Sequence, residues 1–483
     1  KYHELIRLAA EANFNMLRIW GGGIFEDPYF YELCDEYGIL VWQDFLYACS
    51  YYPDDDPAFL AEARREAEIA VRQLRNHPCL AIWCGNNENQ WLHDRLVFYG
   101  EPAAERCYGE RIYDEILPDV CARLDPTRPY WPSSPWGGKD FNAQNAGDTH
   151  AWYVNIGSRN PADRSRYDQW RHDHSKFVTE FGVLSCPSFE SLPDFLPPNE
   201  IARDSQSWLF HENMFDAGNT CQALEMYWRP ADKLSLKEYV RYSQLIQGEA
   251  VRSALEGWRK RKPWTAGALF WVFSDSWGGV GWTIVDYYMR RKSSFYAVKR
   301  ALAHIAASID VWESSDKVNF WLFNDTLADV PVHVRFGLVN VRTGELLKYK
   351  TNEIAHANSS ECISSLDLPN LSLGERDAWA AYAQIVLPDG TESQTHQFLA
   401  GFHYNRVQIP VTNITWERQG NSLVIQTDQF AWQVEIRTPR AVRVEDNYFD
   451  LLPGEQRTIR LSGPAELFDQ VTVSALNSAP LLD

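Results

Sequence analysis

The chain has 483 residues, of which 45% are hydrophobic and 23% are charged, a composition typical of a globular protein with two or three domains. Its net charge of −19 disfavours nucleic acid as a partner, because binding to phosphates requires a basic surface. No apolar run reaches the roughly 18 residues that a membrane-spanning helix needs, and so we expect no membrane partner.

The first residues of the chain have the pattern of the middle of a helix. The segment Lys1-Tyr2-His3-Glu4-Leu5 has the features of neither a signal peptide nor a transit peptide. We therefore expect the numbering to begin inside a larger protein, with any targeting signal upstream. This leaves the compartment undefined, with the cytoplasm as the favoured choice.

Up to about residue 303, short β-branched or aromatic runs alternate with amphipathic helical stretches, which predicts a parallel sheet with crossover connections. Seven candidate strands favour a (β/α)8 TIM barrel that lacks its first strand. A doubly wound open sheet is the alternative, although no glycine-rich nucleotide fingerprint follows a strand. The predicted strands are residues 14–20, 39–42, 80–84, 129–132, 150–154, 177–179 and 268–273, and the clearest helices are 28–37, 57–76 and 234–262.

After about residue 304 the pattern changes to strands of alternating hydrophobicity that are separated by turn residues. This spacing is typical of antiparallel sandwiches. We predict a barrel over residues 1–303 and two small immunoglobulin-like β-sandwiches over 304–408 and 409–483. The predicted sandwich strands are residues 317–324, 330–340, 378–387, 422–427, 433–437 and 455–461.

Two glutamates directly follow predicted barrel strands, at the end of the barrel where catalytic groups lie. Glu88 comes after the run 80–84, and Glu180 after the run 177–179. Hydrolysis of a glycosidic bond needs one carboxylic acid and one carboxylate, and a retaining enzyme holds them roughly 5–5.5 Å apart. Arg18, if it lies near Glu180, would keep that carboxylate charged, and Asn87 could bind the 2-hydroxyl of a sugar.

The aromatic content agrees with a carbohydrate ligand. The chain has 20 Trp, 23 Tyr and 24 Phe, and indole rings offer flat apolar faces that match the C–H faces of sugars. Each feature also has a structural explanation: a glutamate after a strand is often a loop residue, Arg18 could pair with a structural carboxylate, and the tryptophans could be core. These tryptophans are Trp20, Trp152, Trp271, Trp277 and Trp282.

Other kinds of active site find little support. The nine cysteines show no Cys-x-x-Cys spacing, and we expect most of them to be buried thiols. His172 and His174 have no third ligand at a convincing spacing, and so we expect no metal. The sequence also has no Gly-x-Ser-x-Gly elbow of a serine hydrolase.

Several of these segments resemble the β-mannosidases of glycoside hydrolase family 2. The signature segments are Arg18-Ile19-Trp20-Gly21-Gly22-Gly23, Val41-Trp42-Gln43-Asp44-Phe45 and Trp83-Cys84-Gly85-Asn86-Asn87-Glu88-Asn89, and Thr179-Glu180-Phe181-Gly182 resembles the nucleophile segment. Residues 147–152, 267–277 and 282–288 are similar to further active-site stretches, although Ser274 stands where the family usually has Asn. The resemblance covers residues 1 to about 303, and beyond that only the two-sandwich arrangement matches.

The resemblance implies a retaining exo-β-mannosidase that releases terminal β-mannose through a covalent intermediate. Glu88 would be the acid/base and Glu180 the nucleophile, without a metal or cofactor. The implied partners are β-mannoside oligosaccharides or glycoconjugates, with the N-terminal domains of the family supplied by the rest of the same protein. The alternatives are an exo-β-glucosaminidase, an endo-β-mannosidase, or a non-catalytic carbohydrate-binding protein on a decayed barrel. The implied substrate-binding residues are Arg18, Trp20, Asp44, Asn87, His150, Trp152 and Trp271.

Overall fold

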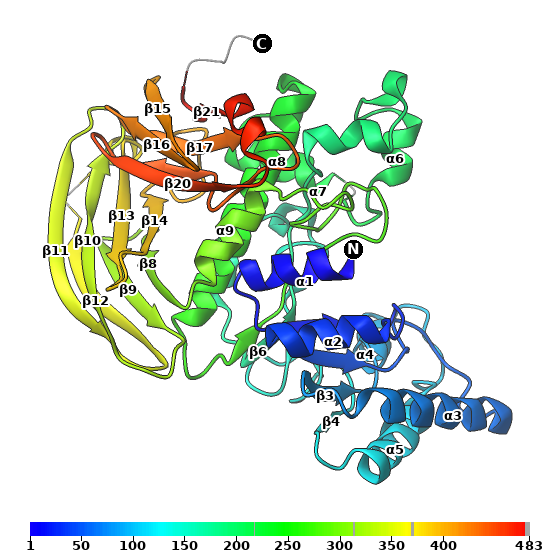
Figure 1. Cartoon of the computed structure of the whole chain (residues 1–483). Coiled ribbons are helices and arrows are strands. Elements are labelled where there is room, and N and C mark those ends of the chain that lie inside the picture. Colours follow the sequence, from blue (N-terminus) through cyan, green and yellow to red (C-terminus); the bar gives the residue numbers. More distant parts are fainter. Residues whose placement is uncertain (217, 313, 369–370, 479–483) are drawn as a thin grey trace. The chain divides into compact units, whose positions relative to one another are not determined.

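The computed structural model describes residues 1–216, 218–312, 314–368 and 371–478 (Figure 1). The chain divides into two compact units: unit 1 comprises residues 1–163, 169–182 and 261–271, and unit 2 the remaining residues. The predicted domain boundaries at residues 303 and 408 stay a prediction, and residues 479–483 of the predicted second sandwich lie outside the described residues. None of the helices in the described part of the chain combines the length and apolar character that crossing a membrane requires.

Four parallel strands of unit 1 form one sheet in the order β1-β2-β3-β4. Arg18 of β1 pairs with Trp42 of β2, and Asp44 of β2 pairs with Cys84 of β3. β2 is buried at four of its five residues, as expected for a strand of a parallel sheet that is covered on both faces. The elements are α1 (Tyr2–Glu11), β1 (Met16–Ile19), α2 (Pro28–Tyr37), β2 (Leu40–Asp44), α3 (Pro57–Leu74), β3 (Leu80–Cys84), α4 (Asn89–Tyr99), the π-helical turn η1 (Ile112–Ile116), α5 (Leu117–Leu124) and β4 (Tyr130–Trp131).

Local signals set the helix boundaries of this sheet. At the start of α2, the side chain of Asp27 accepts a hydrogen bond from the Tyr29 amide, and proline occupies the first turn. α3 begins in the same way after Asp56. α2 ends at Gly38, whose φ of 69° is a left-handed conformation that glycine adopts without strain. The predicted helix 28–37 is confirmed, and the predicted helix 57–76 is two residues shorter.

A second parallel sheet of unit 1 has the order β5-β6-β7, with β5 (Thr149–His150), β6 (Phe177–Glu180) and β7 (Gly267–Ala268). The predicted strand 150–154 is wrong beyond His150, because the chain turns into the 3₁₀ helix η2 (Trp152–Val154). The amides of Asn155 and Gly157 both donate to the carbonyl of Trp152, which closes this turn. Aromatic and β-branched residues favoured a strand here, but local hydrogen bonding prevails.

The last predicted barrel strand, 268–273, is also wrong over most of its length. β7 pairs with β6 only at Gly267 and Ala268. Further along, the Trp271 amide donates to the carbonyl of Phe181, which lies beyond the end of β6, at 2.7 Å. The backbone therefore follows the turn after β6 and stops forming a ladder.

Unit 2 contains helices and two groups of antiparallel sheets. α8 is a long helix whose predicted range of 234–262 contains it, and its N-cap Ser235 forms a capping box with Glu238. α9 packs against α8. The helices are α6 (Gln206–His211), α7 (Asn219–Tyr227), α8 (Leu236–Arg259) and α9 (Ser293–Ala301).

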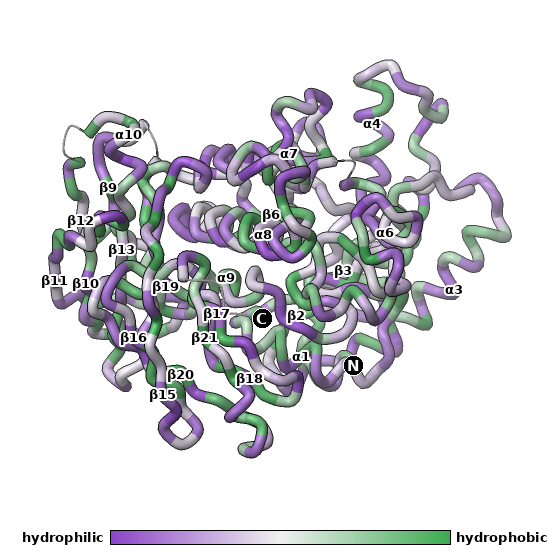
Figure 2. Tube along the Cα trace, turned by 90° about the horizontal axis from the view of Figure 1, so that it is seen from above, coloured by the Kyte–Doolittle hydropathy of each residue, from purple (hydrophilic) through white to green (hydrophobic). Residues whose placement is uncertain are grey.

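The first group has one sheet in the order β11-β10-β13-β14 and a second in the order β12-β9-β8. A core of apolar side chains from both sheets fills the space between them. In β10 the residues Val332, Val334, Phe336 and Leu338 are buried at every second position, and Figure 2 shows hydrophilic and hydrophobic residues interspersed along these strands. The elements are β8 (Ile305–Asp310), β9 (Lys317–Asn324), β10 (Val330–Asn340), β11 (Leu346–Ala355), β12 (Ser359–Asp367), α10 (Leu373–Arg376), β13 (Trp379–Val386) and β14 (Glu392–Phe398).

The second group has sheets in the orders β15-β16-β20-β18 and β19-β17-β21, all antiparallel. The predicted strands 317–324, 330–340 and 422–427 are confirmed at both ends. β11 and β12 were not predicted, because they are mostly polar and lack a clear hydrophobic alternation. The elements are β15 (Ile414–Gln419), β16 (Ser422–Thr427), β17 (Ala431–Arg437), β18 (Arg443–Val444), β19 (Phe449–Leu451), β20 (Gln456–Ser462) and β21 (Thr472–Ser474).

Candidate active site

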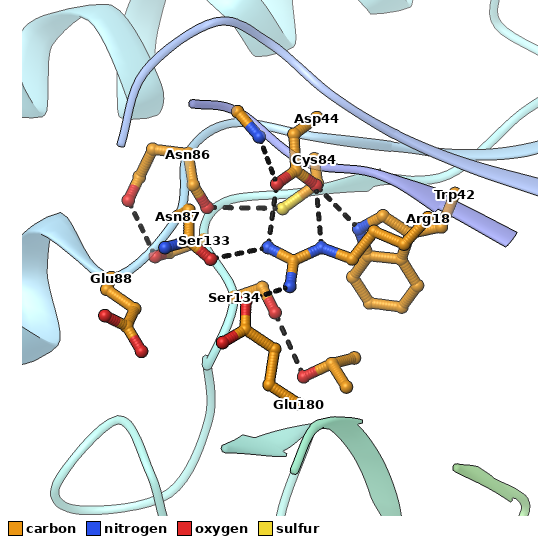
Figure 3. A network of polar contacts seen from close by, with 12 residues as sticks. Arg18, Trp42, Asp44, Cys84, Asn86, Asn87, Glu88, Ser133, Ser134 and Glu180 are labelled. Atoms are coloured by element: carbon orange, nitrogen blue, oxygen red, sulfur yellow. Dashed lines mark hydrogen bonds and ion pairs between the residues drawn. The ribbon is translucent and has the colours of Figure 1, made fainter. Parts of the chain in front are cut away.

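Glu88 and Glu180 follow two different parallel strands of unit 1. Glu180 is the last residue of β6 and is 5% exposed. Glu88 lies four residues after the end of β3 and directly before α4, with a left-handed φ of 65°. Both residues therefore lie beyond or at the C-terminal ends of strands, and Figure 3 shows their side-chain carboxyl groups facing the same space.

The two glutamates converge on one imidazole. An oxygen of Glu88, an oxygen of Glu180 and a ring nitrogen of His150 all lie within 4.8 Å of one another. His150 Nδ1 is 2.6 Å from Glu88 Oε1 and 3.4 Å from Glu180 Oε2. An approach of two carboxyl oxygens to within 4.8 Å is compatible with the roughly 5–5.5 Å between the carboxyl groups of retaining glycosidases.

Glu180 accepts hydrogen bonds from two N–H donors. Arg18 Nη1 donates to Oε1 at 2.7 Å, and Trp152 Nε1 donates to Oε2 at 3.2 Å. The Arg18 side chain is only 6% exposed, and so its charge acts through little water. Donors of this kind stabilise the ionised form of the carboxylate.

Arg18 is itself held in a fixed orientation. Its Nε and Nη2 donate to the two oxygens of Asp44 at 3.2 and 2.7 Å, and Nη2 also donates to Asn87 Oδ1 at 2.7 Å. Asp44 is fully buried and accepts further bonds from Trp42 Nε1 and from the Gly21 amide, each at 3.0 Å. The planar guanidinium therefore joins the ends of β1, β2, β3 and β6 (Figure 3).

The three asparagines around Glu88 have different partners. Asn86 Oδ1 accepts from the Asn89 amide at 3.1 Å and so satisfies the first backbone donor of α4. The Asn87 backbone bridges to the loop after β2, and Asn89 Nδ2 donates to the hydroxyl of Tyr113 at 2.6 Å. The Glu88 amide donates to the Ser134 carbonyl at 2.8 Å. These contacts hold Glu88 in a conformation that a residue with a Cβ rarely adopts.

Glu88 has a second neighbour, a thiol. Cys49 Sγ lies 3.6 Å from Glu88 Oε2 and accepts from Asn87 Nδ2 at 3.3 Å. Cys49 also has a left-handed φ, of 49°, and its amide donates to the Asn87 carbonyl at 2.9 Å. With Oδ1 bonded to Arg18 and Nδ2 bonded to Cys49, the amide of Asn87 has one defined orientation.

Burial changes the acidity of all these groups. The pKa of Glu88 is raised to about 7 by burial, which outweighs the thiol of Cys49 and the charge of Arg18. Burial also raises the pKa of Glu180, and the charge of Arg18 and the hydrogen bond from Trp152 oppose that rise. The pKa of His150 is lowered to about 4, mainly by burial, so its imidazole is neutral at ordinary pH. Although Cys49 is exposed as a residue, desolvation of its thiol raises the pKa of Cys49 to about 12, which keeps the thiol protonated.

Trp20 and Trp271, both expected at the substrate, contact each other. Their ring centroids are 5.0 Å apart in an edge-to-face arrangement. The glycines after Trp20 permit close packing: a Cβ on Gly22 would lie 2.1 Å from the Trp20 ring, and one on Gly21 would lie 2.5 Å from the Tyr47 carbonyl oxygen. Gly21 and Gly22 therefore allow the chain to pack closely against Trp20 and Tyr47.

Comparison with known proteins shows likeness over almost the whole chain. The chain is 31% identical to β-mannosidase B of Thermothelomyces thermophilus, with 96% of this chain and 58% of that protein covered. It is 28% identical to β-mannosidase B of Emericella nidulans over 96% of this chain and 57% of that protein. The crystal structure of β-D-mannosidase from Dictyoglomus thermophilum matches with a TM-score of 0.90 and 35% identity, covering 100% of this chain and 58% of that chain.

The two sequence relatives and the first of the similar structures are all β-mannosidases. This chain spans less than two thirds of the length of the relatives that it matches. Residues 405–479 also match an Ig-fold domain of mannosidases. An exo-chitosanase of Amycolatopsis orientalis has a TM-score of 0.72 at 16% identity, covering 99% of this chain and 61% of that chain, which shows a shared fold.

Seven of the predicted residues form one group, which is connected by hydrogen bonds and by the 3.4 Å contact between His150 and Glu180: Arg18, Asp44, Asn87, Glu88, His150, Trp152 and Glu180. The prediction did not include Cys49, Ser134, Asp148 or Thr179 as site residues. Ser134 donates to Asp148 at 2.7 Å and lies 3.0 Å from His150 Nε2. A signal for it existed, because Ser133 and Ser134 follow the predicted strand 129–132 as Glu88 follows its own.

The trio of Glu88, His150 and Glu180 also has a composition that can bind a metal ion. The guanidinium of Arg18 lies 2.7 Å from Glu180 and already places a positive charge there. A second cation would meet repulsion from this buried charge. The arrangement therefore fits acid–base and nucleophilic chemistry better than metal binding.

Proposed function

We propose that the protein is a retaining exo-β-mannosidase in which Glu88 is the acid/base and Glu180 the nucleophile. The observation that carries this proposal is the convergence of the two carboxyl groups on His150, with an oxygen of each within 4.8 Å. The alternative of a non-catalytic protein on a decayed barrel predicts glutamates that do not converge. The homology with β-mannosidases supports the sugar.

In the first step, a carboxylate oxygen of Glu180 attacks the anomeric carbon of the terminal mannose. As that bond forms, the bond from the anomeric carbon to the leaving oxygen breaks, and Glu88 gives its proton to this oxygen. Glu88 can hold this proton near neutral pH because its pKa is about 7. The donors from Arg18 and Trp152 keep Glu180 ionised for the attack.

In the second step, the ionised Glu88 takes a proton from a water molecule, whose oxygen attacks the anomeric carbon. The bond to Glu180 breaks, and Glu180 leaves as a carboxylate. Two inversions at the same carbon return the original β configuration. The mannose is released, and both glutamates regain their starting protonation states.

Asn87 and Arg18 are the proposed contacts of the sugar 2-hydroxyl. Mannose differs from glucose by its axial 2-hydroxyl, and Asn87 lies between Arg18 and the acid/base. Hydrogen bonds to this hydroxyl strengthen in the transition state and so accelerate the reaction. Trp20, Trp152 and Trp271 would supply apolar faces for the ring, with Asp44 acting through Arg18.

We also propose that the seven parallel strands of unit 1 belong to one (β/α)8 barrel whose first strand is not among them. Both sheets are parallel, and both place their polar residues at the carboxyl ends of the strands. The TM-score of 0.90 with a β-mannosidase structure supports this architecture. The Ig-fold match at residues 405–479 supports a sandwich at the C-terminal end.

The test compares hydrolysis of nitrophenyl β-mannoside, β-glucosaminide and β-galactoside by the full-length protein. We expect the highest kcat/KM on the mannoside. Preference for the glucosaminide or the galactoside would discard the mannose assignment, and a mannan oligosaccharide cut internally would favour the endo-acting alternative.

Covalent trapping tests the mechanism and the nucleophile together. A 2-fluoro-mannosyl fluoride forms the glycosyl–enzyme bond and slows its hydrolysis, so the peptide that contains Glu180 should gain the mass of one 2-fluoro-mannosyl group. The matched control is Glu180→Gln, which should gain none. Labelling of a different carboxylate, or none in an active enzyme, would contradict the role given to Glu180.

A further inference from the structure

A chain of hydrogen bonds runs from Asp148 to the proposed acid/base. Asp148 Oδ2 is 2.7 Å from Ser134 Oγ, which is 3.0 Å from His150 Nε2. The other ring nitrogen, His150 Nδ1, is 2.6 Å from Glu88 Oε1. Ser134 is fully buried, and Asp148 and His150 are each 2% exposed, so water does not offer these groups alternative partners.

The direction of this chain is fixed at Asp148. Its carboxylate accepts from Trp131 Nε1 at 2.8 Å, from the Trp136 amide at 2.9 Å and from the hydroxyl of Thr179 at 2.6 Å. A carboxylate has no proton to give, so the 2.7 Å contact requires that Ser134 donates. If Ser134 turned its proton to Thr179 Oγ1, at 3.1 Å, two bare oxygens would face each other at 2.7 Å.

Ser134 donates its single hydroxyl proton to Asp148, so its oxygen can only accept a hydrogen bond from His150 Nε2. Nε2 therefore carries the proton of the neutral imidazole, and Nδ1 presents a lone pair. A lone pair on Nδ1 cannot donate across the 2.6 Å contact, so the proton of that contact belongs to Glu88. The neutral state of the imidazole agrees with a His150 pKa of about 4.

We propose that Asp148 and Ser134 are positioning residues that select the tautomer of His150 and thereby keep Glu88 protonated before the first step. The inference rests on the proposed function, in which Glu88 is the acid/base. It explains how two glutamates that meet at one imidazole hold different protonation states. The lone pair on Nδ1 faces the proton of Glu88, while Arg18 and Trp152 hold the ionised Glu180.

Other charged and titratable groups also face this pair. Apart from Asp148, none of them bonds to His150 Nε2 or to Ser134. Glu180 Oε2 lies 3.4 Å from His150 Nδ1 and would favour a proton there, but this oxygen accepts a hydrogen bond from Trp152 Nε1, and the shorter 2.6 Å contact of Nδ1 is with Glu88. Around Glu88 these groups are Cys49, Glu180, Arg18 and Arg95, and around His150 they are Glu180, Arg18, Asp148 and Asp44.

Asp148→Asn should reverse the direction of this chain of hydrogen bonds while it keeps the shape of the side chain. Its carbonyl can accept from Trp131 and Trp136, and its NH2 then donates toward Ser134. Ser134 turns its proton to Nε2, and Nδ1 becomes a donor that stabilises the ionised Glu88. We expect the alkaline limb of kcat/KM on an aryl β-mannoside to move down by about one pH unit, which corresponds to about 1.4 kcal/mol of changed interaction with Glu88.

Thr179→Val is the matched control. It removes a donor to the same carboxylate but leaves the contacts from Asp148 through Ser134 to His150, so the alkaline limb should keep its wild-type position. Ser134→Ala removes the acceptor of Nε2 and should move the limb down, as Asp148→Asn does. An alkaline limb that stays in place or moves up in both Asp148→Asn and Ser134→Ala would overturn the inference.

The tautomer can also be read in the wild-type protein, which avoids any variant that fails to fold. The ¹⁵N chemical shifts of His150, assigned with His150→Gln, should show a protonated Nε2 and an unprotonated Nδ1. The reverse pattern would overturn the inference. A wild-type protein that hydrolyses no β-mannoside would instead refute the proposed function, so the two failures are distinguishable.

Discussion

The surroundings of Glu180 and Glu88 differ in the kind of group that faces each carboxyl. Glu180 meets N–H donors from Arg18 and Trp152, whereas Glu88 meets the imidazole of His150 and the thiol of Cys49. Burial raises the pKa of both glutamates and so does not separate them. The hydrogen-bond partners, rather than the depth of burial, distinguish the two carboxyl groups and support the different tasks that we propose for them.

The largest effect is expected at Glu180, the proposed nucleophile. Glu180→Ala should lower kcat on every β-mannoside by on the order of 10⁴-fold or more, because no other group can form the covalent intermediate. Azide added to this variant should restore turnover and yield an α-mannosyl azide, since azide enters from the vacated face. Formation of the β-mannosyl azide instead would show that Glu180 is not the nucleophile.

Glu88→Ala should have an effect that depends on the leaving group. We expect a loss of roughly 10²–10⁴-fold on a natural disaccharide, and a much smaller loss in the first step for an activated dinitrophenyl mannoside, which needs no proton. Azide should here yield the β-mannosyl azide, and Glu88→Gln should behave alike. Equal losses on both substrates would remove the acid/base role from Glu88.

Arg18→Lys tests whether charge alone supports Glu180. Lysine keeps the charge but cannot contact Glu180, Asp44 and Asn87 at once, so we expect kcat/KM to fall by about 10²-fold. The less stabilised Glu180 carboxylate should gain a proton more easily, which moves the acidic limb of the pH profile up. Arg7→Lys, in a partly exposed ion pair of α1, is the control. An acidic limb that does not move would contradict this role.

Cys49 should have the smallest effect. Its thiol lies against Glu88 and stays protonated, so Cys49→Ala should raise the pKa of Glu88 and move the alkaline limb up by about half a pH unit. Cys49→Ser, whose hydroxyl also donates, should leave the limb at or below its wild-type position. Cys362→Ala changes the other exposed cysteine among the described residues and serves as the control. Identical limbs for the Ala and Ser variants would show that the thiol does not act on Glu88.

Local patterns predicted the elements that carry the site. The strand 80–84 and the helix 28–37 agree with the structure at both ends, because caps, prolines and apolar runs are written within the segments themselves. The rule that polar residues follow strands also found Glu88 and Glu180. Where hydrogen bonds outside a regular ladder shape the backbone, the same patterns predicted strands that are not there: a local turn forms at Trp152, and Trp271 contacts the distant Phe181.

The directions of the hydrogen bonds were beyond prediction. Asp148 lies in the segment 147–152, which resembles an active-site stretch of the family. Its proposed role, however, depends on contacts with Ser134 and Thr179, which lie 14 and 31 residues away. Cys49 follows β2 by five residues and was grouped with the expected buried thiols, although it is exposed and faces Glu88. Such roles arise from folding that brings distant residues together, which no spacing in a single sequence records.

The left-handed backbone at Glu88 and Cys49 sets a limit on engineering. Each such conformation costs on the order of 1–3 kcal/mol for a residue with a side chain, and the surrounding hydrogen bonds must hold it. A search for more heat-resistant variants would therefore be drawn to glycine or asparagine at these two positions. Such a substitution would raise the melting temperature but remove the carboxyl or the thiol from the site, so at these two positions stability and the proposed turnover are opposed.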